Sequence, residues 1–140
     1  MSAEKLTDED LTTILTNTKT VAVVGLSTNP SRDSYGVAAY LKKNGYRIIP
    51  VNPAVDEILG EKSYPDLLSI NEAVDVVDVF RRPEFLPEIA EQAVKIKAKV
   101  LWMQLGAQNE EAANIATKAG ITVVQDHCMM AEHSRLIANK

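Results

Sequence analysis

Short runs of β-branched and aliphatic residues recur along this chain and alternate with longer segments that carry an apolar residue every three or four positions. An apolar run of about four to eight residues, closed by glycine or a polar residue, is typical of a strand buried on both faces of a parallel sheet. We therefore expect five buried strands. The runs that fit this description lie at residues 20–25, 46–51, 74–79, 99–103 and 121–124.

The segments around these runs are predicted to be helices, because their apolar residues follow a period of about 3.6 residues. Near the start, Thr7 and Asp10 have the spacing of a capping box, with Asp in place of the usual Glu. Asn44 and Gly45 supply a stop after the second helix. The expected helices span residues 7–18, 35–43, 83–98, 109–119 and 129–138.

Residues 52–73 have no clear period and form the least regular part of the chain. A turn is expected at Asn52–Pro53 and a short strand around Ser63–Tyr64, followed by a helical turn. Pro50 lies inside a predicted strand, so it is expected either near the end of that strand or where its nitrogen faces no partner.

The order of these elements predicts the fold class. Strands that alternate with helices are joined by right-handed crossovers into a parallel sheet with helices on both faces. We therefore expect an α/β, Rossmann-like fold with an open, mainly parallel, doubly wound sheet of five or six strands. The 140 residues suit one domain, residues 1–140, with a helix in residues 1–19 packed on it.

The composition limits the class of partner. No stretch of about 18 apolar residues is present to span a membrane. The acidic start at residues 1–10 has the pattern of no targeting signal. We therefore expect a cytoplasmic protein. The net charge of -4 argues against a nucleic-acid partner, which needs clustered Lys and Arg. A single cysteine, Cys128, excludes an internal disulfide.

A ligand site is expected beyond the carboxyl ends of the strands. In an open parallel sheet, ligands bind there, at the point where the strand order reverses. Loops that follow directly after the predicted strands and carry small or polar residues are therefore expected to converge on one crevice. They lie at residues 25–35, 51–53, 80–82, 104–106 and 125–128.

The first of these loops has the features of a phosphate site. It leads into a helix whose free N–H groups and positive dipole end attract a phosphate. Arg32 adds a guanidinium that can contact a phosphate through two hydrogen bonds. The same residue types also serve as ordinary turn and cap residues, and this alternative stays open. Hydroxyl donors come from Ser27, Thr28, Ser31 and Ser34.

The loop does not have the sequence of a typical NAD site. The dinucleotide fingerprint has a second glycine two residues after the first, and an acidic residue at the end of the second strand. Here Ser27 stands in place of that glycine, and residues 51–53 contain no acidic group. A nucleotide-dependent enzyme, such as an oxidoreductase with an atypical NAD site, is kept as the alternative function.

Five short motifs at these strand ends resemble those of one known family. In this order they resemble the small stand-alone CoA-binding domain proteins, which are similar to the N-terminal domain of the succinyl-CoA synthetase alpha subunit. The resemblance covers about residues 21–136. The motifs are Val-Val-Gly-Leu-Ser at residues 23–27, Val-Asn-Pro at 51–53, Val-Asp-Val-Phe-Arg at 77–81, Leu-Trp-Met-Gln-Leu-Gly at 101–106 and Gln-Asp-His-Cys at 125–128.

The resemblance implies a fold that holds coenzyme A or an acyl-CoA across these loops, with the first loop near the phosphates. The synthetase keeps its phosphorylated histidine in a second domain that is not expected here, so we expect a non-catalytic binding module. A homo-oligomer, or a partner protein that supplies catalysis, fits the same picture. With the polar residues of the first loop, the expected ligand-binding residues are Gly25, Leu26, Ser27, Thr28, Arg32, Ser34, Val51, Asn52, Pro53, Phe80, Arg81, Gln104, Gly106, Asp126 and Cys128.

The end of the chain carries groups with other potential roles. His127 could lower the pKa of the neighbouring Cys128, but adjacent residues usually point apart and no third orienting group is identified, so a catalytic cysteine is not favoured. A mixed disulfide between Cys128 and the CoA thiol stays open. A metal site would have enough donors here, but their spacing matches no recognised metal motif; the donors are Asp126, His127, Glu132 and His133. Asp126 is expected instead to cap the last helix.

Overall fold

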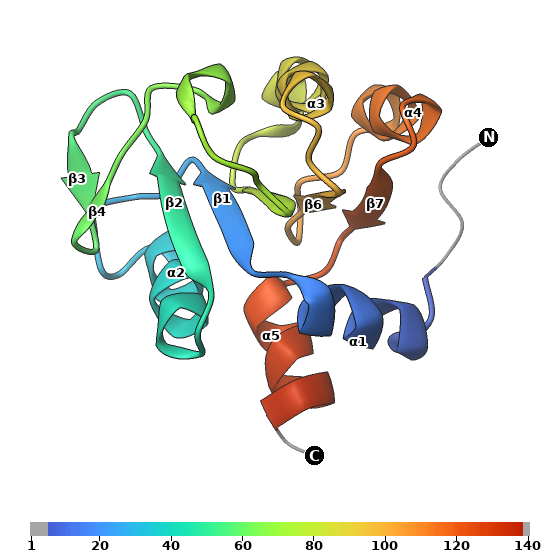
Figure 1. Ribbon diagram of the computed structural model, residues 1–140, viewed down its shortest axis with the longest axis horizontal. Coiled ribbons are helices and arrows are strands. Elements are labelled where there is room, and N and C mark those ends of the chain that lie inside the picture. The colour runs from blue at the N-terminus through green and yellow to red at the C-terminus, as the bar shows by residue number, and fades with distance from the viewer. Residues whose placement is uncertain (1–5, 139–140) are drawn as a thin grey trace.

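The protein is described by a computed structural model, which covers residues 6–138. A central parallel sheet is covered by helices on both faces (Figure 1). In chain order, the elements are α1 (Asp8–Asn17), β1 (Thr20–Val24), α2 (Asp33–Lys43), β2 (Arg47–Val51), β3 (Glu57–Ile58), β4 (Glu61–Lys62), the 3-10 helix η1 (Leu67–Ser69), β5 (Val76–Val79), the 3-10 turn η2 (Pro83–Phe85), α3 (Leu86–Lys95), β6 (Val100–Met103), α4 (Glu110–Lys118), β7 (Thr122–Gln125), α5 (Met129–His133) and the π-helical turn η3 (Ser134–Ala138).

The main sheet has five strands in the order β2-β1-β5-β6-β7, all parallel. The chain moves outward from β1 to β2, then returns to the other side of β1 and continues through β5, β6 and β7. The strand order therefore reverses between β1 and β5, and a crevice is expected at that point, beyond the carboxyl ends of the strands. The predicted α/β, doubly wound, Rossmann-like fold is confirmed.

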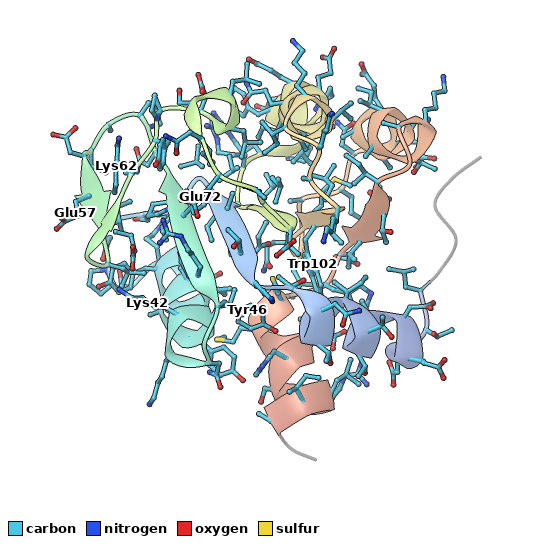
Figure 2. All side chains as sticks on the ribbon, in the orientation of Figure 1. Lys42, Tyr46, Glu57, Lys62, Glu72 and Trp102 are labelled. Carbon is cyan, nitrogen blue, oxygen red and sulfur yellow. The ribbon has the colours of Figure 1, made fainter. Side chains whose placement is uncertain are left out.

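Alternate residues of each strand supply two separate cores. On β1, Val21 and Val23 face the layer formed by α1, α2 and α5, while Ala22 and Val24 face the layer formed by η1, α3 and α4 (Figure 1). Trp102 of β6 lies on the side of α1 and α5 (Figure 2) and is fully buried. Its indole Nε1 donates to the carbonyl oxygen of His127 at 2.9 Å, so the core is tied to the start of α5.

The predicted helix at residues 83–98 is interrupted. Pro83 opens a 3-10 turn, and Pro87 lies in the first turn of α3, where its missing N–H needs no partner. Lys97 has a positive φ of 60° and ends the segment. The helix expected from residue 35 begins at Asp33 instead, and the one expected at residues 129–138 is the short α5 followed by a π-helical turn.

Residues 52–73 differ most from the expectation. Leu59 and Gly60 both have positive φ, at 55° and 74°, and they form the two-residue turn of the hairpin β3–β4, which was not predicted. The strand expected at Ser63–Tyr64 is reduced to a bridge, in which the Tyr64 N–H donates to the Pro50 carbonyl at 3.0 Å. Because the N–H and C=O of one strand residue point the same way, the Pro50 nitrogen faces the outer edge of the sheet, as predicted.

Helix α2 holds the hairpin against the body of the protein. Figure 2 labels Lys42 of α2 with Glu57 and Lys62 of the hairpin. The Lys42 ammonium donates to the carbonyl oxygen of Leu59 at 2.5 Å and lies 3.2 Å from the carboxylate of Glu61. The hairpin and the Tyr64 bridge therefore cover the β2 edge of the sheet.

The predicted N-terminal helix packs on the sheet. The Thr7 hydroxyl accepts from the Asp10 N–H at 3.1 Å, and the Asp10 carboxylate accepts from the Thr7 N–H at 3.0 Å, so the predicted capping box is confirmed. Leu11 and Leu15 are buried against the sheet. Residues 1–5, part of the acidic stretch in which no targeting signal is expected, lie outside the described residues. No helix within residues 6–138 is long and apolar enough to cross a membrane.

Candidate functional site

Two cavities lie at the carboxyl ends of the strands. The first has a volume of about 540 Å³ and opens where β1, β5 and β6 end. All of its lining residues come from three of the predicted loops or from the two residues next to them. The predicted ligand-binding residues that line it are Gly25, Ser27, Arg32, Ser34, Phe80, Arg81, Gln104 and Gly106.

The second cavity, of about 220 Å³, lies between the ends of β1 and β2 and helices η1 and α3. Val51 and Pro53, from the predicted set, contribute to its wall with Val24, Ile89 and Phe85. Its polar rim includes Asp66, Glu88 and Gln92. The wall suits an apolar ring, and the rim suits groups that donate hydrogen bonds.

Gly25 allows two loops to meet at the centre of the crevice. Its φ of 85° lies in the left-handed region that favours glycine. A Cβ at this position would lie 2.9 Å from the Cδ atom of Arg81, so the side chain of Arg81 crosses directly over the glycine. A residue without a side chain is therefore needed where the two loops meet.

The first loop is folded by its own polar side chains. The Ser34 hydroxyl accepts from the Ser27 N–H at 2.9 Å, and the Ser27 hydroxyl accepts from the Asn29 N–H at 3.0 Å. The Asn29 carboxamide accepts from the N–H of Ser31 at 3.0 Å. Ser27 and Ser34 therefore fold the loop as turn residues, which is the alternative to a phosphate site that the sequence left open. The hydroxyl hydrogens of Ser27 and Ser34 are still available as donors to a ligand.

The electrostatics of the first cavity favour an anion. Guanidinium groups of Arg32, Arg81 and Arg82 line it, against the single carboxylate of Asp33. Helix α2 begins at Asp33 and has 11 residues, so the positive end of its dipole also faces the cavity. An anionic group of a ligand would be stabilised here.

Gln104 connects the cavity wall to the last helix. The side chain is buried, and its amide oxygen accepts from the Met129 N–H at 3.1 Å, at the start of α5. That hydrogen bond leaves the amide NH₂ group of Gln104 as a donor at the cavity. Gln104 therefore has a structural role and a potential ligand-binding role.

Some predicted residues line neither cavity. Leu26 is fully buried in the core, and Thr28 is exposed on the first loop. Asn52 holds two loops together: its amide NH₂ donates to the Leu26 carbonyl at 2.9 Å, and its amide oxygen accepts from the Ala54 N–H at 2.9 Å. Asn52 therefore stabilises the loops that form the site without lining either cavity.

Asp126 and Cys128 also lie outside the two cavities. Asp126 has a positive φ of 59°, and its carboxylate accepts from the Gly106 N–H at 3.5 Å. The prediction that Asp126 caps the last helix is wrong, because Cys128 occupies the N-cap position and the first N–H group of α5 is bonded to Gln104. The half-buried Cys128 packs against the core on the side of α1, α2 and α5.

The histidines near the C-terminus have separate partners. His127 Nδ1 lies 2.8 Å from Glu132, whose other carboxylate oxygen accepts from Arg135 at 2.9 Å. His133 Nδ1 lies 2.9 Å from the hydroxyl of Tyr40, and burial lowers the pKa of His133 below its ordinary value. Within residues 6–138, no group of three or more His, Cys, Asp or Glu side chains is placed to hold a metal.

One buried acid, Asp78, lies inside β5, the strand that leads to Phe80 of the first cavity. Asp78 of β5 is fully buried between Val23 and Trp102 in the register of the sheet, and neither carboxylate oxygen has a hydrogen-bond partner. Burial raises the pKa of Asp78 well above its ordinary value. The signal in the sequence is a carboxylate with valines on both sides, two residues before Phe80.

Sequence reasoning missed part of the site. Asp33, Arg82 and Leu105 fall inside the predicted loops but were not selected, and Pro83 and Ala107 lie one residue beyond them. Ser31, predicted as a hydroxyl donor, also lines the cavity. The α3 side of the second cavity had no signal, because Phe85, Ile89 and Gln92 reach it only through the packing of the helix on the sheet.

Comparison with known proteins identifies the family. Residues 19–134 match a family model described as a CoA binding domain. The chain belongs to the CoA-binding domain family. The predicted resemblance is therefore confirmed.

This CoA-binding domain corresponds to small proteins and to part of an enzyme. It is 45% identical over 121 residues to uncharacterized protein YneT of Bacillus subtilis (strain 168), across 86% of this chain and 90% of the relative. It is 36% identical over 117 residues to the ADP-forming acetate–CoA ligase II of Archaeoglobus fulgidus, across 75% of this chain and 17% of the ligase. A solved structure of a hypothetical protein from Pyrococcus horikoshii OT3 has 45% identity and a TM-score of 0.93, over 98% of this chain and 99% of that one.

Proposed function

We propose that this protein binds coenzyme A or an acyl-CoA in the crevice formed by the two cavities, and that it does so without catalysing a reaction. The observation that carries the proposal is the first cavity, where Gly25, three guanidinium groups and the start of α2 meet in a member of a CoA-binding family. The diphosphate of CoA supplies the anionic group that such a site favours.

The two cavities suit the two ends of this ligand. In the proposed mode, the adenine ring lies against the apolar wall of the second cavity, formed by Val51, Pro53 and Ile89. The pantetheine arm follows the first cavity toward Leu105, which is an exposed apolar residue at its edge. The volumes, about 540 and 220 Å³, together fall in the range of about 300–1,000 Å³ that is usual for cofactor sites.

Non-catalytic binding is proposed because the cavity walls hold no nucleophile with an adjacent base among the described residues. Cys128 and His127, the residues considered for that role, line neither cavity. A cytoplasmic location and a partner protein or second copy are part of the same proposal.

An atypical NAD site is the second candidate, and one observation favours it. Asp66 and Glu88 line the second cavity and could accept from ribose hydroxyls. Asp66 already accepts from the N–H and the hydroxyl of Ser69 at 2.9 and 2.8 Å, both at the same carboxylate oxygen. Neither Asp66 nor Glu88 lies at the end of β2, where a typical NAD site has its acidic residue, and we therefore rank CoA first.

Competition between the two ligands tests the proposal. The reduced protein would be mixed with equimolar CoA and NAD and examined by native mass spectrometry, which separates the two complexes by mass. We expect the CoA complex to dominate. A dominant NAD complex would contradict the proposal and place the oxidoreductase alternative first.

A further inference from the structure

Arg81 separates the two cavities of the crevice. Of the described residues that line them, only Arg81 is common to both. Its aliphatic stem crosses Gly25, which lines the first cavity. Its guanidinium lies over the ring of Phe85, which lines the second, with 4.2 Å between Cζ and the ring centroid. The side chain thus occupies the boundary that a ligand spanning both cavities must cross.

Within the part of the chain that the structure describes, the Phe85 ring is the group that holds the guanidinium in this position. No acidic side chain within residues 6–138 forms an ion pair with Arg81, whereas the neighbouring Arg82 lies 3.7 Å from the carboxylate of Glu84. A cation–π stack at a partly exposed position is a weak interaction. A guanidinium–phosphate contact is stronger, because it is charge-assisted and takes two parallel hydrogen bonds. A phosphate at the boundary would therefore draw Arg81 away from Phe85.

We propose that Arg81 is a gate between the two cavities, with the stack on Phe85 as its closed position. A ligand that occupies both cavities opens the gate by pairing a phosphate with the guanidinium. This inference rests on the proposed function, since CoA carries its diphosphate between an aromatic base and a long neutral arm. Arg81 is then the residue that selects ligands with an anionic group in the middle of their length.

The position of Arg81 explains how one residue acts on both cavities. Its stem lies beside Gly25, since the Cδ atom would be 2.9 Å from a Cβ on that glycine. Arg81 also lines the first cavity, where the α2 N-terminus favours an anion, so a phosphate bound in that cavity offers the guanidinium an alternative to the ring.

Titration of the full 15.3 kDa chain with CoA, followed by ¹H–¹⁵N NMR, tests the gate. We expect CoA to shift amide signals of both cavities, for example those of Ser27 and Ile89. Arg81→Gln keeps the stem and removes the charge, and we expect it to weaken CoA binding at least about tenfold. The control Lys118→Gln removes one positive charge at the far end of α4, away from both cavities, and is expected to weaken binding less than about twofold.

Three results would overturn the gate. CoA shifts confined to one cavity of the unmodified protein would show that the ligand does not cross the boundary, and this result does not depend on how any variant folds. Equal losses in Arg81→Gln and Lys118→Gln would show a general charge effect. A protein whose signals do not respond to CoA at all would contradict the proposed function itself, and the gate would fall with it.

Discussion

Gly25 and Phe80 approach each other so closely that no side chain fits between them: a Cβ on Gly25 would lie 2.5 Å from the carbonyl oxygen of Phe80. The two residues follow β1 and β5, the neighbouring strands between which the strand order reverses. This contact closes the floor of the crevice and brings the first loop beneath the side chain of Arg81. The shape of the site therefore depends on the absence of one methyl group.

Gly25→Ala is expected to destabilise the protein. The added methyl must displace backbone atoms, and the positive φ adds strain, so we expect a loss of about 1–3 kcal/mol in the free energy of unfolding. Gly36→Ala is the matched control, because Gly36 lies inside α2 with nothing within 4 Å of an added Cβ. The control is expected to gain about 0.5–1 kcal/mol. Urea unfolding measures both, and equal effects of the two changes would contradict the close approach.

Asp78→Asn is expected to change how stability depends on pH. Burial raises the pKa of Asp78 in the folded protein, so the carboxyl stays protonated there while the unfolded chain ionises it above its ordinary pKa of 3.8. Stability is therefore lost as pH rises from that value to the folded pKa, by about 1.4 kcal/mol for each pH unit between them. The variant has no carboxyl to titrate.

The free energy of unfolding, measured for both proteins from pH 4 to pH 8, checks this prediction. The variant is expected to gain stability relative to the natural protein as the pH rises. A constant difference across the range would mean that Asp78 is not protonated in the fold.

Asp75→Asn is expected to have the opposite pH dependence. Burial works to raise the pKa of Asp75, but hydrogen bonds from the N–H groups of Thr20 and Lys19, and the Lys99 ammonium, hold it below its ordinary value. A lowered pKa contributes stability above the unfolded value of 3.8, and this is lost as pH falls through the folded pKa. We expect the variant to lose about 1–3 kcal/mol at pH 7. The same unfolding series should show this loss shrinking toward acid pH, and a loss that grows there would refute the assignment.

Arg32→Gln is expected to weaken CoA binding about three- to tenfold, because an exposed guanidinium at the first cavity supplies one phosphate contact. The control Lys118→Gln removes the same charge at the far end of α4, away from the crevice. It should leave the affinity unchanged within about twofold. Titration calorimetry at two salt concentrations measures both, and a loss in the control equal to that in Arg32→Gln would indicate a general field effect.

The sheet could be predicted from the sequence because each buried strand is a short, continuous apolar run that ends at a glycine or a polar residue. The first cavity could also be predicted from the sequence, since its residues follow directly after strands and the topology brings the ends of those strands together. The second cavity was not, because Phe85 and Ile89 reach it from a helix face whose orientation depends on packing. The roles of Asn52 and Asp126 were missed for a similar reason: each bonds to a backbone group on another loop.

The hairpin β3–β4 had only a weak local signal in the sequence, Gly60. Leu59 precedes Gly60, and both adopt positive φ, although leucine rarely does so. A typical turn of this kind has Asn or Asp at the first position. The contacts of Lys42 with this turn and with Glu61 hold the hairpin in place, and such contacts cannot be predicted from a local pattern.

Isothermal titration of the reduced protein with CoA, 3′-dephospho-CoA, NAD and ATP in one buffer tests the central claim most directly. The account predicts saturable binding of CoA at one molecule per chain and weaker binding of NAD. Binding of NAD with no binding of CoA would contradict it.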